Sequence, residues 1–153
     1  MLKPLAILFA LSLPVHAQDV LAEYQTDSGS LPPEYAWDTT VSILTDGQLS
    51  LKHCTGYETE GPYCKTRRAT VAQGALAAIR TAAAESGLAE KPAREAEEIV
   101  VGGGLTGGAV YLDGKKIDLL PQPAKADVER VGKVLDAIAA AIPPRFDRFM
   151  DPD

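Results

Sequence analysis

The stretch that decides the fold runs from residue 39 to residue 54 and reads TTVSILTDGQLSLKHC. Apolar and polar residues alternate on both sides of Asp46 and Gly47, which is the pattern of a β-hairpin with one buried face. A two-residue turn would put the apolar residues of the two strands on opposite faces of the hairpin. A three-residue loop that ends in a left-handed Gly47 instead pairs Ile43 with Leu49 on one face. We therefore predict a bulged hairpin whose apolar face is covered by the rest of the chain.

Residues 1–17 have the composition of a cleaved signal peptide. Lys3 supplies a short positive start, an apolar run covers residues 5–13, and a small-residue cleavage site ends at Ala17. The apolar run is too short to span a bilayer, which takes about 20 residues. No cysteine stands directly after the cleavage point, so we expect no lipid or membrane anchor. The mature chain is predicted to begin at Gln18 and to be periplasmic or secreted.

The predicted mature chain is acidic. Without the signal peptide, 14 Lys and Arg stand against 21 Asp and Glu, which gives a net charge of −7, compared with −6 for the whole chain. This charge disfavours nucleic acid and anionic membrane surfaces as partners. The length suits one domain, which we place at residues 18–144, followed by a short C-terminal tail at residues 145–153.

Cys54 and Cys64 are the two cysteines of the chain. An even number of cysteines in an exported protein predicts a disulfide, and the spacing differs from the C-x-x-C of redox pairs. The bridge closes a loop of nine intervening residues with two glycines, a proline and two tyrosines. We predict a structural disulfide that constrains this loop.

Further strands are predicted on both sides of the hairpin. Residues 18–25 have the alternation of a first strand, and residues 65–68 continue antiparallel to the hairpin. Residues 99–120 form a second β region, in which Asp113 and Gly114 make the two-residue turn of a tight hairpin.

Two amphipathic stretches predict helices. The first begins at Thr70, where Gln73 completes a capping box, and ends with Gly87 in the left-handed position after the helix. Its apolar stripe comprises Ala72, Leu76, Ile79 and Ala83. The second helix covers residues 125–142 and is stopped by two prolines. Its apolar stripe comprises Val128, Val131, Leu135, Ile138 and Ile142.

The predicted fold is therefore α+β, with one disulfide. An antiparallel sheet of five or six strands carries two helices packed on one face. In the tail, the spacing of Phe146 and Phe149 suits docking as one more helical turn.

The glycine-rich segment at residues 99–107, IVVGGGLTG, matches the G-x-G-x-x-G pattern of dinucleotide sites. Such a site needs a helix that begins at the last glycine and faces the pyrophosphate. Here the following residues lead directly into the turn at Asp113, which leaves no room for that helix. We therefore predict a glycine-rich loop between strands, and no nucleotide or other cofactor.

His53 is the only histidine of the predicted mature chain, so any general base or metal site must use it. Because residues two apart in a strand share a face, His53 lies on the same face of the hairpin as Leu49 and Leu51. We therefore interpret it first as a half-buried structural histidine. One His and two bridged Cys cannot form a zinc site, and acidic residues such as Glu58 and Glu60 lack calcium-loop spacing. We predict no metal and no catalytic residue, and keep a small periplasmic hydrolase that uses His53 as the alternative.

Four aromatic residues are candidates for a binding surface. Tyr35 and Trp37 precede the hairpin, and Tyr57 and Tyr63 lie in the disulfide loop. If these loops meet at one end of the sheet, the rings form the kind of rigid aromatic surface that interfaces favour. The alternative is that the rings cap the edge of the core and pack the loops.

The order of elements resembles that of small exported bacterial domains of unassigned activity, and is similar to that of emfourin-type inhibitors of bacterial metalloproteases. The resemblance covers roughly residues 23–142 and rests on the strand pair V-S-I-L-T-D-G-Q-L-S-L, the helix end A-A-A-E-S-G-L, a hairpin and a last helix. The loop between Cys54 and Cys64 departs from the inhibitor pattern, and no functional residue carries over. The expected function is a non-enzymatic exported domain that binds a protein or peptide partner, with protease inhibition as the activity that the resemblance implies.

Overall fold

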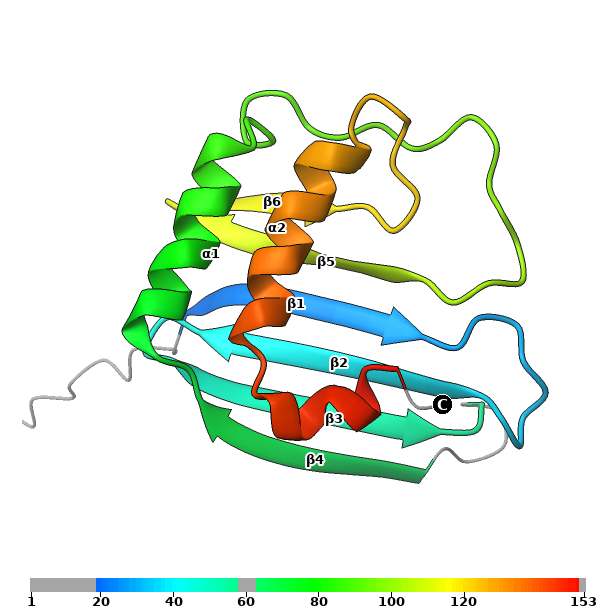
Figure 1. Ribbon diagram of the computed structural model, residues 1–153. Helices are drawn as coiled ribbons and strands as arrows, with labels where there is room; N and C mark the ends of the chain where they lie inside the picture. Colours follow the sequence, from blue (N-terminus) through cyan, green and yellow to red (C-terminus); the bar gives the residue numbers. More distant parts are fainter. Residues whose placement is uncertain (1–18, 58–62, 152–153) are drawn as a thin grey trace, which may run out of the picture.

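A computed structural model describes residues 19–57 and 63–151 of the protein (Figure 1). The predicted signal peptide lies outside the described residues, as do Glu58 and Glu60 of the disulfide loop and the last two residues. The described chain forms an antiparallel six-stranded sheet with two helices in front of one face, which confirms the predicted α+β fold.

The first strand of the chain lies near the centre of the sheet. The strands are β1 (Val20–Asp27), β2 (Trp37–Leu44), β3 (Gln48–Thr55), β4 (Tyr63–Thr70), β5 (Thr106–Leu112) and β6 (Lys115–Leu119). Their order across the sheet is β4-β3-β2-β1-β5-β6. The helices are α1 (Gln73–Glu85), α2 (Val128–Ala141) and the short 3₁₀ helix η2 (Pro144–Phe149), drawn in red in Figure 1.

The β2–β3 hairpin has the predicted bulged register. Gly47 has a φ of 92°, and the hairpin pairs Ile43 with Leu49 and Val41 with Leu51. These four side chains share one face and are buried under the helices. The same turn also holds the entry to α1, because the Gly47 carbonyl accepts a hydrogen bond of 2.7 Å from the Val71 amide.

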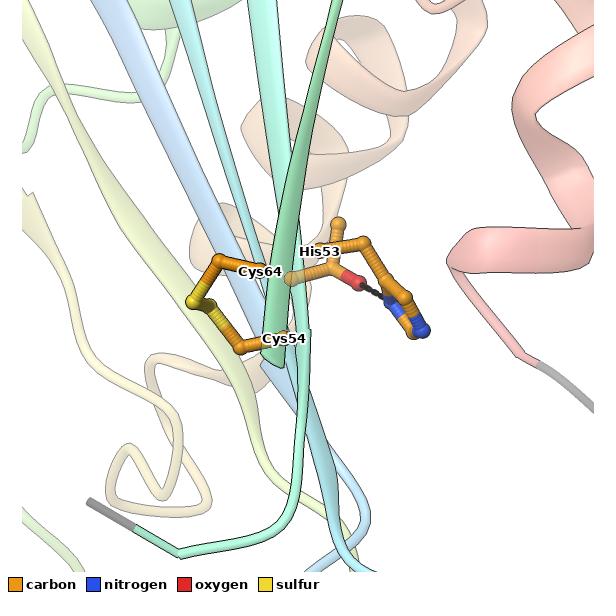
Figure 2. The surroundings of a disulfide bond; sticks show 4 residues. His53, Cys54 and Cys64 are labelled. Atoms are coloured by element: carbon orange, nitrogen blue, oxygen red, sulfur yellow. Dashed lines mark hydrogen bonds between the residues drawn. A yellow bond between two sulfur atoms is a disulfide. The ribbon is translucent and has the colours of Figure 1, made fainter. Parts of the chain in front are cut away.

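The predicted disulfide is present and joins two neighbouring strands. Cys54 of β3 lies directly opposite Cys64 of β4, with 4.0 Å between their Cα atoms. Successive residues of a strand point to opposite faces. The disulfide therefore lies on the sheet face away from the helices, and the preceding His53 lies on the helix-covered face (Figure 2).

The second β region is shorter than predicted. The turn at Asp113 and Gly114 is the expected two-residue turn, since Leu112 pairs with Lys115 and both turn residues have positive φ. However, β5 begins at Thr106, so the prediction of strand structure from residue 99 was wrong. The neighbouring strand β1 ends at Asp27, one residue beyond the last pair with β5, and offers no partner for the earlier residues.

Helix α1 begins later than predicted. Thr70 is still paired with Gln48 at the end of β4, so it cannot start a helix, and no side chain caps the helix at Ala72. The predicted inward stripe is otherwise confirmed, because Leu76, Ile79 and Ala83 are buried. Gly87 has a φ of 67° after the helix, and Leu88 folds back into the core as expected.

Helix α2 buries most of the predicted stripe, and Val128 is the exception. It begins at Val128, which is 53% exposed, while Val134 lies in the core in its place. The carboxylate of the buried Asp127 accepts a hydrogen bond of 3.0 Å from the Arg94 amide and binds Arg130 one turn later. These contacts fix the start of α2 and the face that it buries. The buried residues of the helix are Val131, Val134, Ile138 and Ala141.

The left-handed residue of the hairpin turn gives a first prediction. A Cβ on Gly47 would lie 2.7 Å from the Val71 carbonyl oxygen, in a backbone conformation that L-residues disfavour. We expect Gly47→Ala to lower the free energy of unfolding by about 2 kcal/mol, as measured by urea denaturation. The control is Gly132→Ala in the middle of α2, where a Cβ meets nothing within 4 Å. It should raise stability by about 0.5–1 kcal/mol, and equal effects at the two sites would contradict this account.

A second prediction concerns the disulfide. Because it cross-links residues 10 apart in sequence, the double variant of Cys54→Ala and Cys64→Ala should lose roughly 2–3 kcal/mol of unfolding free energy. Urea denaturation with and without a reductant measures the effect. The reductant should destabilise the native protein and leave the double variant unchanged.

Candidate binding site at one end of the sheet

Strand ends and loops gather at one end of the sheet, on the right in Figure 1. Here β1, β3 and β6 end, and β2, β4 and β5 begin. The Gly56 amide donates to the Ala36 carbonyl over 2.9 Å, and the Asp27 amide donates to the Leu105 carbonyl over 3.1 Å. These bonds tie the three connecting loops to one another. We call this the aromatic end, and define it by Leu31, Tyr35, Trp37, Tyr57 and Tyr63.

The four predicted aromatic residues all lie at this end, in different settings. Tyr35 and Tyr63 are 66% and 64% exposed, whereas Trp37 is partly buried. The Tyr57 hydroxyl donates to the Leu31 carbonyl, so this ring joins the loop after β3 to the loop before β2. Trp37, Thr55 and Tyr63 form one row across three strands, which puts Tyr63 two strands from Trp37 on the same face.

A hollow of about 430 Å³ opens beside Trp37. Its walls combine aromatic, apolar and polar side chains, and His53 forms part of its lining. The lining residues are Leu31, Glu34, Tyr35, Ala36, Trp37, His53 and Thr55. The hollow therefore lies between the loop before β2 and the helix-covered face of the sheet.

An aromatic ladder leads from this hollow into the core. Ring centroids are 6.1 Å apart for Trp37 and His53, 5.4 Å for His53 and Phe149, and 6.4 Å for Phe149 and Phe146. Phe146 is buried, so η2 anchors the ladder at its inner end. Trp37 thus caps the edge of the core, which was one of the two interpretations of this residue, while Tyr35 and Tyr63 stay exposed.

His53 occupies a defined hydrogen-bonding position. Its Nδ1 lies 2.7 Å from the hydroxyl of the buried Thr39, and that hydroxyl donates its proton to the Phe149 carbonyl (Figure 2 shows the His53 contact). Because the hydroxyl has one proton, Nδ1 must carry its own proton and donate it to Thr39. The neutral imidazole therefore keeps Nε2 as its acceptor nitrogen.

A cation adjoins the histidine. The Arg67 guanidinium lies 3.8 Å from the centre of the Phe149 ring, and its buried Nη1 has no hydrogen-bond partner in the described part of the chain. The ring face takes the place of a polar acceptor. Burial, followed by the charge of Arg67, lowers the pKa of His53, and the Asp38 carboxylate opposes this shift. The site thus favours an uncharged imidazole.

The described residues place no hydrogen-bonded acid partner and no metal-binding cluster beside His53. Across residues 19–57 and 63–151, no carboxylate hydrogen-bonds to His53, and the Thr39 hydroxyl is already used. In the same ranges, no three His, Cys, Asp or Glu side chains gather as a metal site. What the arrangement can do is present a hollow and a rigid set of rings to a ligand.

The glycine-rich segment has a packing role at this end. A Cβ on Gly29 would lie 2.3 Å from the Gly103 carbonyl oxygen, and one on Gly104 would lie 2.5 Å from the Asp27 carbonyl oxygen. The glycines let two loops touch through their backbones. The segment leads into strand β5 and not into a helix, as the sequence predicted.

A larger hollow of about 560 Å³ lies against β1, β5 and β6. Four of its charged groups have partners within the domain. Glu23 accepts from the Tyr111 hydroxyl over 3.0 Å, and Lys116 pairs with Asp118 over 2.8 Å. Asp27 accepts hydrogen bonds from two loop amides. These charged groups are therefore engaged within the domain, whereas Tyr35 and Tyr63 at the aromatic end are exposed.

Three residues of the site were not identified from the sequence. Phe149 and Arg67 adjoin His53 because η2 folds across β2, β3 and β4, and no local pattern shows where a C-terminal turn docks. Leu31 lies in the loop before β2, where no sequence pattern marks it as part of a site. The Phe146 and Phe149 spacing was the available signal, and both rings do pack against the core.

No protein-family model matches this chain, and no curated protein matches it. Neither helix in the described residues is long and apolar enough to cross a membrane.

A pH prediction follows from the surroundings of His53. A lowered pKa in the folded state means that protonation opposes folding. The stability that the neutral ring contributes is complete above the ordinary pKa of 6.5, and is lost as the pH falls through the folded-state value. We therefore expect the unfolding free energy of the native protein to fall between pH 7.5 and pH 5 by more than that of His53→Gln. Urea titrations at each pH measure this, and parallel curves would contradict it.

Proposed function

We propose that this is a non-enzymatic exported domain that binds a protein or peptide partner through the aromatic end, and that the partner is a protease which it inhibits. The leader-like residues 1–17 and the disulfide support export to the periplasm or the medium. The negative charge makes nucleic acid an unsuitable partner.

One observation carries the proposal. Among the described residues, eight large hydrophobic side chains are exposed, and seven of them belong to the loops and strand starts at one end of the sheet. The eighth is Val128, on α2. The seven are Leu31, Tyr35, Tyr57, Tyr63, Ile99, Val100 and Val101. Exposed apolar side chains scattered singly need no explanation, but their concentration at one end is typical of an interaction surface.

The same end is held by many hydrogen bonds, which favours binding. The Ser28 amide donates to the Trp37 carbonyl over 3.0 Å, and the Ser28 hydroxyl accepts from the Trp37 amide over 3.0 Å. A surface that is ordered before binding loses less conformational entropy when the partner arrives. This supports recognition by a rigid surface over recognition by loops that fold on contact.

The choice of a protease as the partner rests on the similarity in element order to emfourin-type inhibitors. The alternative, a small periplasmic hydrolase that uses His53, has one favourable feature, an acceptor Nε2 on a histidine that lines a hollow. It lacks an acid to orient the imidazole, and the lowered pKa leaves Nε2 a weak base. Binding therefore has the stronger support.

The test begins with the purified mature protein immobilised and exposed to periplasm or culture medium of the source cells. A captured endopeptidase whose peptidase activity falls when the free domain is added would support the proposal. Tyr35→Ala and Tyr63→Ala should each weaken the complex by about 1–2 kcal/mol, or roughly tenfold, in isothermal titration.

The matched control is Val128→Ala. It removes an exposed apolar side chain of helix α2, which is not one of the residues that define the aromatic end, and it should leave the affinity for the partner unchanged. Hydrolysis of a test substrate by the domain alone, abolished by His53→Ala, would establish the alternative and overturn the proposal.

A further inference from the structure

Residues 99–101, Ile-Val-Val, are the most exposed apolar segment of the described chain. Ile99, Val100 and Val101 are 64%, 73% and 87% exposed. β-branched side chains in a row usually occur in a buried strand, and these have no strand neighbour. Their exposure calls for a physical explanation beyond the packing of this domain.

A glutamine side chain holds the segment in place. The Val100 amide donates to Gln122 Oε1 over 2.7 Å, and Gln122 Nε2 donates to the Val100 carbonyl over 2.8 Å. The exchange of both bonds with one residue is the pattern of a hydrogen-bonded pair in an antiparallel ladder. The Gln122 amide thus substitutes for a neighbouring strand, and the amide and carbonyl of Val100 face the same side, as they do in a strand.

The opposite edge of the segment is free. In an extended chain, the backbone groups of alternate residues point to opposite sides. Since Val100 points toward Gln122, the amides and carbonyls of Ile99 and Val101 point away, and no hydrogen bond within the described residues uses them. The segment therefore presents an unpaired strand edge and three apolar side chains together.

The segment is also fixed on both sides. On the N-terminal side, the Ala96 amide donates to the Gln122 carbonyl over 2.9 Å. On the C-terminal side, the Leu105 amide and carbonyl both bond to Asp27. An extended segment held in this way is prepared for binding without a large loss of entropy.

We propose that residues 99–101 enter the substrate groove of an endopeptidase that selects aliphatic residues, where they pair as an added strand and block the groove. This rests on the proposed function and names the class of protease and the segment that contacts it. A substrate groove binds extended chains through backbone hydrogen bonds and side-chain pockets, the two features that the segment presents. The exposed Glu97 and Glu98 precede it, so the complementary groove is neutral or basic on that side.

The test uses two proteases as probes, a pancreatic elastase and thermolysin, both of which act at aliphatic residues, with trypsin as the specificity control. Inhibition constants are measured with peptide substrates. Val101→Pro removes an amide proton that no group of the described chain accepts, so the unfolding free energy should not change. It should raise the inhibition constant for at least one probe by tenfold or more, and trypsin should not be inhibited.

The matched control is Val101→Thr, which keeps the amide and nearly the same shape, and should stay within about threefold of the native constant. If Val101→Pro lowers stability, Val101→Glu tests the same contact through the side chain and should also cost tenfold or more.

Three outcomes overturn this inference alone, and the first two are as follows. In one, a protease is inhibited equally by the native protein, Val101→Pro and Val101→Glu, while Tyr35→Ala inhibits less. In the other, light scattering shows a dimer that Val101→Pro dissociates, so that the edge pairs with a second copy. If the native protein inhibits neither probe yet still captures a partner through the aromatic end, the inference also fails and partner binding stands. If it captures no partner at all, both proposals fail.

Discussion

The register of the β2–β3 hairpin is the constraint on which the rest of the structure depends. A loop of three residues aligns four buried side chains on one face, and a shift of one residue would turn half of them to the opposite face. Both helices then cover this face, and η2 extends the cover as far as His53. The opposite face carries the disulfide and pairs of charged and polar groups. One face of the sheet therefore forms the core, and the other does not.

The sequence predicted what depends on neighbours along the chain. The turn at Gly47, the pairing of Cys54 with Cys64 and the two-residue turn at Asp113 all follow from local conformational preference or from cysteine number, and the structure has them. Strand structure from residue 99 was wrong because a β-branched run specifies a strand only where another strand offers its edge. The start of α1 was wrong because pairing within the sheet holds Thr70 in β4.

The candidate site was predictable only in part. The aromatic residues could be selected by type, since they flank turns, and the loops that carry them do meet at one end of the sheet. The neighbours of His53 could not be found in this way. Phe149 lies 96 positions away in sequence, and the position of η2 depends on how the chain leaves α2 at two successive prolines. Tertiary packing thus determines the chemistry of the histidine, whose local sequence shows only which face it occupies.

The position of β1 in the middle of the sheet has a consequence for biogenesis. A chain that is synthesised from its N-terminus can assemble the meander from β1 to β4 once residue 70 is available. One side of β1 then stays open until β5 arrives, because β5 is its partner across more than 80 residues of sequence. Such an open side is a template for association with other emerging chains. Pairing with β5 closes this side of β1, so the arrival of the second β region removes an edge that favours aggregation.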